Sequence, residues 1–436
     1  MNLNSRDKKL IWHPFTQEKT AGLPMAIKKG QGSYLYDEKD NAYLDLISSW
    51  WVNLYGHAHP EIAQSIYQQA TTLEHVIFAG FTHEPAVQLC ETLNSLLPPT
   101  LSRFFFSDNG STSIEVALKM TYQYWKNKEG KERKLFICLE GGYHGDTFGA
   151  MSVGSECGYH DHFRELFFNV LSIPFPATWD NDKDAEEKES RSLAILQGHL
   201  EQNPGQIAAL IVEPLVQGAS GMRMCRPSFI KKAGELVHTH DSLLIFDEVM
   251  TGFGRTGSNF AMEQTGIVPD FLCLSKGITG GFLPLALTVT SHKIYEAFLS
   301  DEWKHAFSHG HSYTANPLAC AAAVTATRLL QSDATQQAIL AINKAHQQGL
   351  ATLKSNCRHI MHTRIQGTIA AFDFTTPAQG KRHTGSPLPR QFMNEGLILR
   401  PIGNTIYLIP PYSTTPEELI KAYEKIEIVL RQKNTF

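Results

Sequence analysis

The sequence predicts an α/β fold, with a large domain built on a mostly parallel sheet between helices and a smaller α+β lobe. Two observations support this prediction. Through the middle of the chain, short and nearly continuous apolar runs alternate with amphipathic stretches, as expected for strands that helices bury on both faces. After about residue 330 the pattern changes to a long polar-faced helix followed by short strands, which indicates a second lobe.

The composition is that of an ordinary globular protein. The chain has 436 residues, 42% hydrophobic and 19% charged, with a net charge of -4. This is enough apolar material for a sizeable core, and the charge gives no reason to expect a nucleic-acid partner. The opening sequence MNLNSRDKKLIWHPF lacks the apolar stretch of a signal peptide, and no run of about 18 apolar residues predicts a membrane span.

The seven cysteines are widely spaced and form no CxxC pair. An odd number without such a pair argues against a disulfide framework or a zinc site, and fits a reducing cytoplasm. We expect each cysteine to serve as a small buried hydrophobe. They are Cys90, Cys138, Cys157, Cys225, Cys273, Cys320 and Cys357.

The elements of the large domain follow from these apolar runs. Strands are expected at 103–107, 134–139, 207–212, 242–246, 271–274 and 284–290. A helix is expected at 112–125, where Ile114, Leu118 and Tyr122 share one side, and another at 227–240, where Pro227 stands at a favourable first position. The charge run 181–191 is expected to be a solvated loop leading into a helix.

Three parts of the chain are predicted. Residues 1–59 form an N-terminal segment that contributes to the small lobe and the active site. Residues 60–330 form the large domain that holds the site. Residues 331–436 form the small lobe, with short strands near 367–374, 397–400 and 405–409 and a final amphipathic helix.

Polar residues follow several of the predicted strands. Asp247 follows the run at 242–246, Lys276 follows the run at 271–274, and Tyr143 comes shortly after the run at 134–139. Ligands of a doubly wound sheet bind beyond the carboxyl ends of its strands. Each of these residues taken alone is more often a turn, cap, packing or surface residue, so only their combination carries an argument.

Together they match the needs of a cofactor with an aldehyde, a pyridine ring and a phosphate, which is pyridoxal 5′-phosphate. A desolvated amine, here Lys276, can bind the aldehyde. The Asp247 carboxylate can keep the ring nitrogen protonated, and the Tyr143 ring can stack on the pyridine. Gly110 and Ser111 open a helix, and the free N–H groups of a helix N-terminus suit a phosphate.

Two other kinds of site are predicted to be absent. The segment GFGRTG (252–257) fits the dinucleotide pattern GxGxxG, but Asp247 and Glu248 separate it from the strand and no clear helix follows, which excludes a nicotinamide site. The histidine pairs at 57–59, 160–162 and 309–311 lack HExxH spacing. We therefore predict no metal site and assign them local hydrogen bonds.

A family resemblance follows from longer motifs. LLIFDEVMTGFGRTG followed by DFLCLSKGITGG resembles the signature of the class III, fold-type I aminotransferases, which use pyridoxal phosphate. Narrower motifs resemble the branch that aminates 8-amino-7-oxononanoate to 7,8-diaminononanoate in biotin synthesis. They are IWHPFTQ (11–17), SSWWVNLYGHAHP (48–60), GGYHGDTFGAMSVG (141–154), EPLVQGASGM (213–222), HGHSYTANPLACAAA (309–323) and LRPIGNTIYLIPPY (399–412).

The resemblance implies cofactor roles. Lys276 would carry the cofactor and move the proton, Asp247 would pair with the ring nitrogen, and Tyr143 would stack on the ring and border the substrate. The phosphate would be held by residues from both subunits of a homodimer. These are Gly110 and Ser111 of one subunit, and His311 and Ser312 of the partner subunit.

The resemblance also implies substrate roles. Trp50 and Gly310 would line the pocket, and Arg400 would read a substrate carboxylate, for which a guanidinium is well suited. Arg255 and Tyr407 would border the same pocket.

The amino donor stays open between two compounds. Most relatives use S-adenosylmethionine and some use lysine. Many members have a tyrosine, thought to contact the amino substrate, where this chain has Phe15; the PFTQ form resembles a lysine-using relative. However, Trp50 and Trp51 keep the paired aromatic residues of the other type, and aromatic faces suit a sulfonium cation. We therefore favour S-adenosylmethionine.

Two broader alternatives have less support. One is a class III enzyme acting on ornithine, 4-aminobutyrate or another ω-amine, against which the HPFTQ, SSWW and RPIGNTIYL motifs argue. The other is a binding or regulatory module without enzymatic activity. Such a module would lack the lysine or carry an added DNA-binding domain, whereas Lys276 is present.

Overall fold

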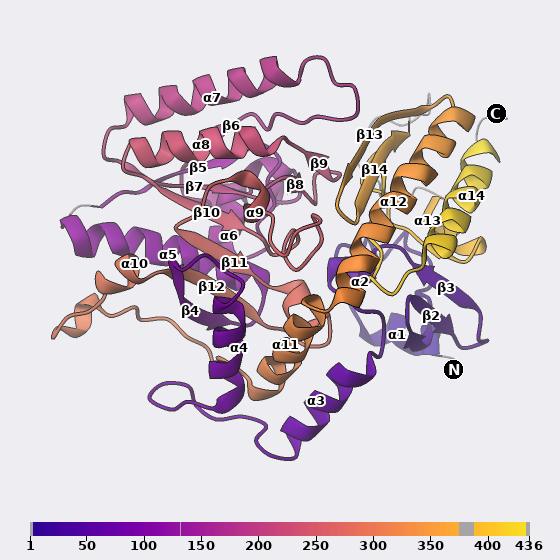
Figure 1. Cartoon of the computed structure of the whole chain (residues 1–436), viewed down its shortest axis with the longest axis horizontal. Helices are drawn as coiled ribbons and strands as arrows, with labels where there is room; N and C mark the ends of the chain where they lie inside the picture. The colour runs from indigo at the N-terminus through magenta and orange to yellow at the C-terminus, as the bar shows by residue number, and fades with distance from the viewer. Residues whose placement is uncertain (1–2, 131, 375–387, 433–436) are drawn as a thin grey trace.

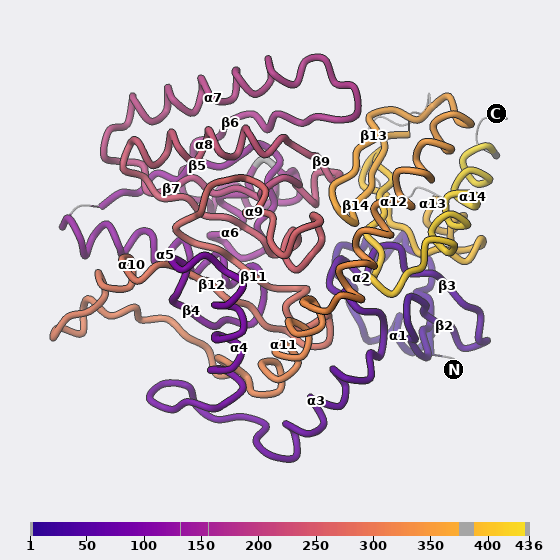
Figure 2. Tube along the Cα trace, viewed as in Figure 1, coloured from indigo at the N-terminus to yellow at the C-terminus, as the bar shows by residue number. Residues whose placement is uncertain are grey.

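The computed structural model describes residues 3–130, 132–374 and 388–432. In Figure 1 the large sheet, with α5, α7 and α8, fills the left of the molecule, and α12–α14 with β13 and β14 fill the right. The tube view in Figure 2 shows the first and last parts of the chain on the same side. The α/β fold class, with a mostly parallel sheet between helices, is confirmed.

The large sheet has seven strands in the order β4-β12-β11-β10-β7-β5-β6. β12 runs antiparallel to both of its neighbours, whereas β11, β10, β7, β5 and β6 are parallel to one another. All six predicted strands are present; β6 was not predicted, because it is short and mostly half-buried. The bounds are β4 (Leu101–Ser107), β5 (Leu135–Leu139), β6 (Val170–Ile173), β7 (Ile207–Val212), β10 (Leu243–Asp247), β11 (Phe271–Leu274) and β12 (Ala286–Ser291).

Helices cover both faces of this sheet, which explains its continuous apolar strands. Along β10, Leu244 and Phe246 pack into one core with Phe229 of α8, while Ile245 packs into a second core with Ile114 of α5. Both predicted helices are present, as α5 (Gly110–Glu129) and α8 (Pro227–Thr239). Among the described residues, no helix has the length and apolar character needed to cross a membrane.

The remaining helices fill out the two faces and the lobes. They are α1 (Leu3–Leu10), α2 (Ser48–Trp51), α3 (Pro60–Ala70), α4 (Glu84–Asn94), α6 (Phe148–Val153), α7 (Ala185–Gln202), α9 (Met262–Thr265), α10 (His292–Glu296), α11 (Pro317–Leu330), α12 (Asp333–Asn356), α13 (Leu388–Asn394) and α14 (Pro416–Gln432).

The charge run at 181–191 leads into a helix as predicted, but the helix begins early and one of its charges is not solvated. Helix α7 begins at Ala185, so most of the run is helical. Glu189 is buried and accepts two hydrogen bonds from Arg226, at 2.6 and 2.8 Å. A buried charge needs such a partner, and Arg226 lies too far along the chain for a local pattern to reveal it.

The small lobe combines both ends of the chain. One sheet has the order β1-β2-β3-β15, in which β15 pairs in parallel with β3, and a second has the order β13-β14-β16. The predicted strands near 367–374, 397–400 and 405–409 are present as β14, β15 and β16, whereas β13 and the N-terminal strands β1, β2 and β3 were not predicted. The bounds are β1 (Ile27–Gln31), β2 (Tyr34–Asp37), β3 (Ala42–Asp45), β13 (Ile360–Gln366), β14 (Ile369–Phe374), β15 (Leu397–Ile398) and β16 (Thr405–Leu408).

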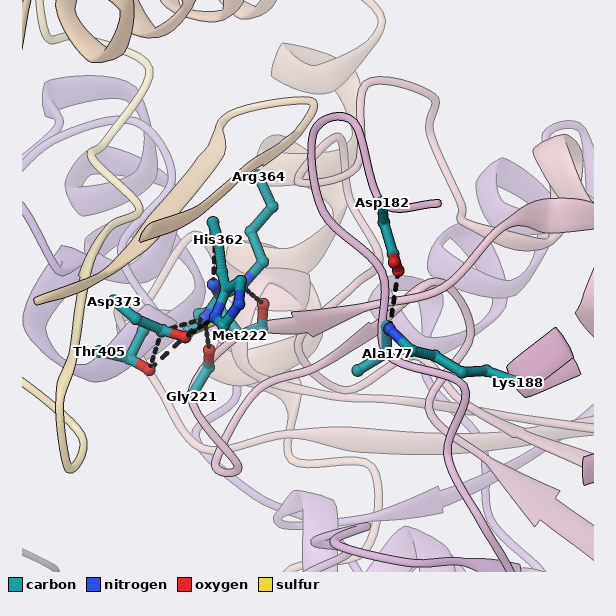
Figure 3. A network of polar contacts seen from close by, with 9 residues as sticks. All are labelled: Ala177, Asp182, Lys188, Gly221, Met222, His362, Arg364, Asp373 and Thr405. Atoms are coloured by element: carbon teal, nitrogen blue, oxygen red, sulfur yellow. Dashed lines mark hydrogen bonds and ion pairs between the residues drawn. The ribbon is translucent and has the colours of Figure 1, made fainter. Parts of the chain in front are cut away.

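A buried arginine connects the small lobe to the large domain. The guanidinium of Arg364 donates to the carbonyl of Gly221 at 2.6 Å and to that of Met222 at 2.8 Å, and it pairs with Asp373 at 3.1 Å (Figure 3). The two carbonyls lie between β8 (Val216–Gln217) and β9 (Arg223–Met224). This contact fixes the position of the segment between β8 and β9, which lies close in sequence to the candidate site.

Candidate active site

A cavity of about 430 Å³ lies beyond the carboxyl ends of the central strands. Five residues singled out in the sequence line it: Gly110, Ser111, Tyr143, Asp247 and Lys276. They come from four separate stretches of the chain, which the strand order brings to one edge of the sheet. Two larger hollows, of about 1010 and 940 Å³, lie against β4 and α5, but neither contains these residues.

Lys276 stands in the turn that joins β11 to β12. Its backbone has a φ of +45°, a strained conformation of the kind that collects at functional sites. Gly281 closes the turn with a φ of +91°, where a Cβ would lie 2.9 Å from the backbone of Val52 and Asn53. The turn therefore needs glycine there, and it directs the lysine into the cavity.

The surroundings of Lys276 favour a neutral amine. Burial lowers the pKa of Lys276, and the charges of Asp247 and Glu213 offset this only in part. The Nζ atom lies 4.8 Å from the centre of the Trp51 ring. A neutral amine is the form that attacks an aldehyde, so this environment suits the predicted role.

Asp247 ends β10 and is held by two donors. Its Oδ2 lies 2.7 Å from Nδ1 of His144, and its Oδ1 accepts the N–H of Val249 at 3.0 Å. Because a carboxylate only accepts hydrogen bonds, Nδ1 of His144 carries a proton. His144, which comes shortly after β5, was not among the predicted site residues. Its position next to Tyr143 was the feature of the sequence that could have indicated it.

Glu213 is the acidic residue that sequence reasoning missed. Glu213 directly follows β7, a position similar to that of Asp247 at the end of β10. Its two carboxylate oxygens accept the N–H groups of Tyr143 at 3.0 Å and Gly218 at 2.9 Å. Burial raises the pKa of Glu213 to about 7, with His144 lowering it and Asp247 raising it. A second carboxyl group therefore lies beside the pair of Asp247 and His144.

The N-terminus of α5 forms the opposite wall. Asn109 caps it by accepting the N–H of Thr112 at 3.1 Å. Gly110 and Ser111, the first two residues of the helix, line the cavity, and N–H groups at a helix start have no intrahelical partners. Ser111 Oγ accepts the N–H of Asp146 at 3.1 Å. Gly145 has a φ of +123°, and a Cβ there would meet Ser111 at 2.1 Å. Small residues thus keep this end open for an anion.

Aromatic rings form a rim next to the cavity. The Phe15 ring lies 5.6 Å from Trp50 and 6.0 Å from Tyr159, and Tyr159 lies 6.2 Å from Tyr143. The guanidinium of Arg400 lies 4.6 Å from the centre of the Trp50 ring. Residues from four distant segments therefore meet at this rim.

Trp50 owes its place to an unusual turn. Ser48, Ser49, Trp50 and Trp51 all have positive φ values, between +45° and +73°. Non-glycine residues rarely adopt this left-handed conformation, and here Ser48 secures it by donating to the carbonyl of Ile409 at 2.6 Å. Trp51 points inward to the cavity, while Trp50 is 38% exposed.

Of the eight predicted substrate residues, only Tyr143 and Lys276 line the cavity itself. Phe15, Trp50 and Arg400 lie at the rim, whereas Arg255 and Tyr407 are buried and reach neither cavity nor rim. Arg255 is buried and donates to the backbone carbonyls of Pro410 and Asn53, both at 2.8 Å. Tyr407 is also buried, and its hydroxyl accepts Nε1 of Trp51 at 3.2 Å. Arg255 therefore joins chain segments, and Tyr407 contacts the cavity only through Trp51.

His311 and Ser312, which are predicted to act from a partner subunit, and Gly310, which is predicted to line the substrate pocket, also lie outside this cavity. Gly310 and Ser312 are exposed, and His311 is half-buried.

Within the described ranges, no group of three or more His, Cys, Asp or Glu side chains is arranged to hold a metal ion. Instead His57 pairs with Asp45, and His160 pairs with Asp146, both at 3.0 Å.

Comparisons with known proteins agree on one family. The model described as Aminotransferase class-III matches residues 15–430. An adenosylmethionine-8-amino-7-oxononanoate aminotransferase from Synechococcus elongatus is 48% identical over 421 residues, covering 96% of this chain and 98% of that one.

Solved structures have the same fold over nearly the full length. The enzyme of that name from Methanocaldococcus jannaschii is 32% identical, with a TM-score of 0.91 and 99% of each chain covered. An amine transaminase from an uncultivated Pseudomonas species, solved with PLP bound, is 29% identical, with a TM-score of 0.88 and coverage of 97% of this chain and 99% of that one.

Proposed function

Since this chain belongs to the class III aminotransferases, we propose that it converts 8-amino-7-oxononanoate to 7,8-diaminononanoate in biotin biosynthesis. S-adenosylmethionine is the amino donor and pyridoxal 5′-phosphate is the cofactor. One observation supports the proposal above all others: Lys276, Asp247 and the N-terminus of α5 line a single cavity. The names of the relatives at 48% and 32% identity support the choice of substrates.

The residues of the cavity fit the cofactor. Lys276, with its lowered pKa, would bind the aldehyde and carry the proton between carbon atoms. Asp247, held by His144, would keep a proton on the ring nitrogen. Gly110 and Ser111 would bind the phosphate through N–H groups. Bound pyridoxal phosphate supplies an aldehyde that takes up the amino group and a ring that withdraws electrons from the reacting carbon.

The rim fits the substrates. Tyr143 would border both cofactor and substrate, and Trp50 would provide an apolar wall. Arg400, whose guanidinium is close to Trp50, would bind the carboxylate at the far end of the acceptor. The donor product leaves before the acceptor enters, so the same cavity serves both in a ping-pong order.

Lysine is the second candidate for the donor, and Phe15 favours it. Phe15 contacts Trp50 and Tyr159 at the rim but has no hydroxyl with which to orient a polar donor. The aromatic rings around it favour S-adenosylmethionine, because a sulfonium cation gains about 0.5–2 kcal/mol against an aromatic face.

The complete site is proposed to need a homodimer. His311 and Ser312 would reach the phosphate of the partner subunit, and the exposure of Ser312 supports this. Gly310, beside them, would line the substrate pocket. We propose a cytoplasmic setting for the reaction, supported by seven cysteines that are all free thiols.

A half-reaction experiment tests the proposal and separates the donors. The cofactor-loaded protein is mixed with S-adenosylmethionine or with lysine alone, and the cofactor absorbance is followed. S-adenosylmethionine should change the spectrum, and later addition of 8-amino-7-oxononanoate should restore it with formation of 7,8-diaminononanoate, identified by mass spectrometry. A spectrum changed by lysine alone would reverse the donor assignment. Failure of the acceptor to restore it would overturn the proposed reaction.

A further inference from the structure

Asp146 connects three features of the candidate site. Its backbone N–H donates to Ser111 Oγ at 3.1 Å, at the N-terminus of α5. Its Oδ2 accepts the hydroxyl of Tyr143 at 2.8 Å, and its Oδ1 lies 3.0 Å from Nε2 of His160. One residue therefore links the helix end proposed to hold the phosphate with the ring proposed to stack on the cofactor.

His160 lies behind this carboxylate, away from solvent. Its side chain is 3% exposed, whereas that of Asp146 is 50% exposed. The imidazole stacks against the Tyr143 ring, with centroids 5.6 Å apart and an interplanar angle of 30°. Its Nδ1 faces Sγ of Cys157 at 3.4 Å. Both nitrogens and one face of the ring thus have partners, which hold the imidazole in one orientation.

The contact between His160 and Asp146 is an ion pair near neutral pH. Nε2 must carry a proton, because a carboxylate only accepts hydrogen bonds. Burial lowers the pKa of His160, but the contacts with Asp146 and Cys157 outweigh burial and raise that pKa to about 9. Burial raises the pKa of Asp146, while His160 and Tyr143 lower it by more. The Asp146 carboxylate is therefore ionised, and the buried His160 imidazole holds it in place.

We propose that His160 is a positioning residue that acts through Asp146 on Tyr143. It holds the Asp146 carboxylate in the orientation that accepts the Tyr143 hydroxyl, and so sets the angle of the ring at the cavity wall. Without His160, the half-exposed carboxylate is free to turn toward solvent, and Tyr143 loses its fixed acceptor. The role rests on the proposed function in one respect, since Tyr143 is taken to contact the bound cofactor.

Two substitutions separate the hydrogen bond from the ring. His160→Gln keeps an N–H donor near the position of Nε2 but removes the ring. His160→Phe keeps a ring against Tyr143 but removes the donor. His238→Phe is a matched control, because His238 pairs with Asp270 at 3.0 Å and Asp270 precedes β11, at the opposite edge of the sheet from Lys276.

The first measurement is the visible circular dichroism of the bound cofactor, which reports how asymmetrically its ring is surrounded. His160→Phe should change this band and raise the KM for the amino donor about tenfold, as expected for the loss of a hydrogen bond to a charged group, with a smaller change in kcat. His160→Gln should retain most of the band and the KM. His238→Phe should match the parent protein in both.

A double-mutant cycle with Asp146→Asn then tests the route of the effect. If His160 acts through Asp146, the double variant with His160→Phe should be no worse than Asp146→Asn alone. Additive losses, or an unchanged band in His160→Phe, would overturn the proposal. Asp146→Asn alone should reproduce the change in the band, which keeps the proposal testable if His160→Phe does not fold.

The dichroism measurement also separates this proposal from the proposed reaction, because it needs bound cofactor but no substrate. If the parent protein bound the cofactor but reacted with neither proposed substrate, the proposed reaction would be contradicted. The role of His160 would still be tested by comparing the dichroism band of the bound cofactor in the parent protein and in His160→Phe.

Discussion

Nδ1 of His144 lies 2.7 Å from Oδ2 of Asp247, and both side chains are almost fully buried. Asp247 ends β10, whereas His144 lies just beyond β5, two strands away in the sheet. The imidazole thus orients the carboxylate that is proposed to face the cofactor ring. Fixed charges of this kind need no rearrangement when charge develops in the transition state.

Asp247→Asn should retain the fold and bound cofactor but lower kcat by several orders of magnitude, because the charge opposite the ring nitrogen acts mainly in the transition state. His144→Phe should cause a smaller loss, since the carboxylate remains but is less well oriented. Steady-state kinetics on cofactor-loaded protein measure both. Turnover near that of the parent in Asp247→Asn would mean that Asp247 is only a turn residue.

Lys276→Ala should abolish turnover, because binding the aldehyde and moving the proton both need its amine. In the parent protein, borohydride reduction should fix the cofactor covalently on Lys276, as peptide mapping by mass spectrometry can show. Lys231→Ala, at an exposed lysine on α8 outside the cavity, should keep both turnover and labelling. Labelling of a different lysine would contradict the assignment.

Arg400→Leu should weaken recognition of the acceptor, with less effect on kcat. The acceptor KM should rise by about tenfold to a hundredfold, because a charged hydrogen bond to the substrate carboxylate is lost. Steady-state kinetics with the acceptor varied at a saturating donor concentration measure this. Arg328→Leu is the control, since Arg328 forms an exposed ion pair with Glu61 far along the chain from the rim. An unchanged acceptor KM in Arg400→Leu would assign Arg400 to packing against Trp50.

Stability should depend on pH through Glu213. Its folded-state pKa is raised to about 7, so its contribution to stability is complete below the ordinary pKa of the group and is lost as the pH rises through about 7. Glu213→Gln cannot ionise, and should therefore compare more favourably with the parent at about pH 8.5 than at about pH 5. Melting temperatures of cofactor-free protein test this, with the exposed Glu187→Gln as a variant that should show no such trend.

The protein should sediment as a dimer. If Ser312 completes the phosphate site of the partner subunit, a monomer has an incomplete site, and dilution that dissociates the dimer should release cofactor and activity together. Analytical ultracentrifugation with activity measured at the same concentrations tests this. A monomer with full activity would contradict the shared site.

The sequence by itself determined six of the seven strands of the large sheet, though not their order, and brought out several residues of the candidate site. Strands buried on both faces must be apolar throughout, so β7 and β11 could be recognised from single runs with the bounds that the structure has. Asp247 and Lys276 follow such runs, and the carboxyl ends of strands are where ligands bind. Local order along the chain was enough for these predictions.

The tertiary structure alone decided what depends on partners far apart in the chain. Glu189 can be buried because Arg226 pairs with it, and Arg255 binds the carbonyls of Asn53 and Pro410. The ion pair of His160 with Asp146 matters for the site because Asp146 also binds Tyr143. A sequence shows which groups are charged or aromatic. Only the folded chain brings them within hydrogen-bond distance and removes water from around them, and these two effects together determine their pKa values and their roles.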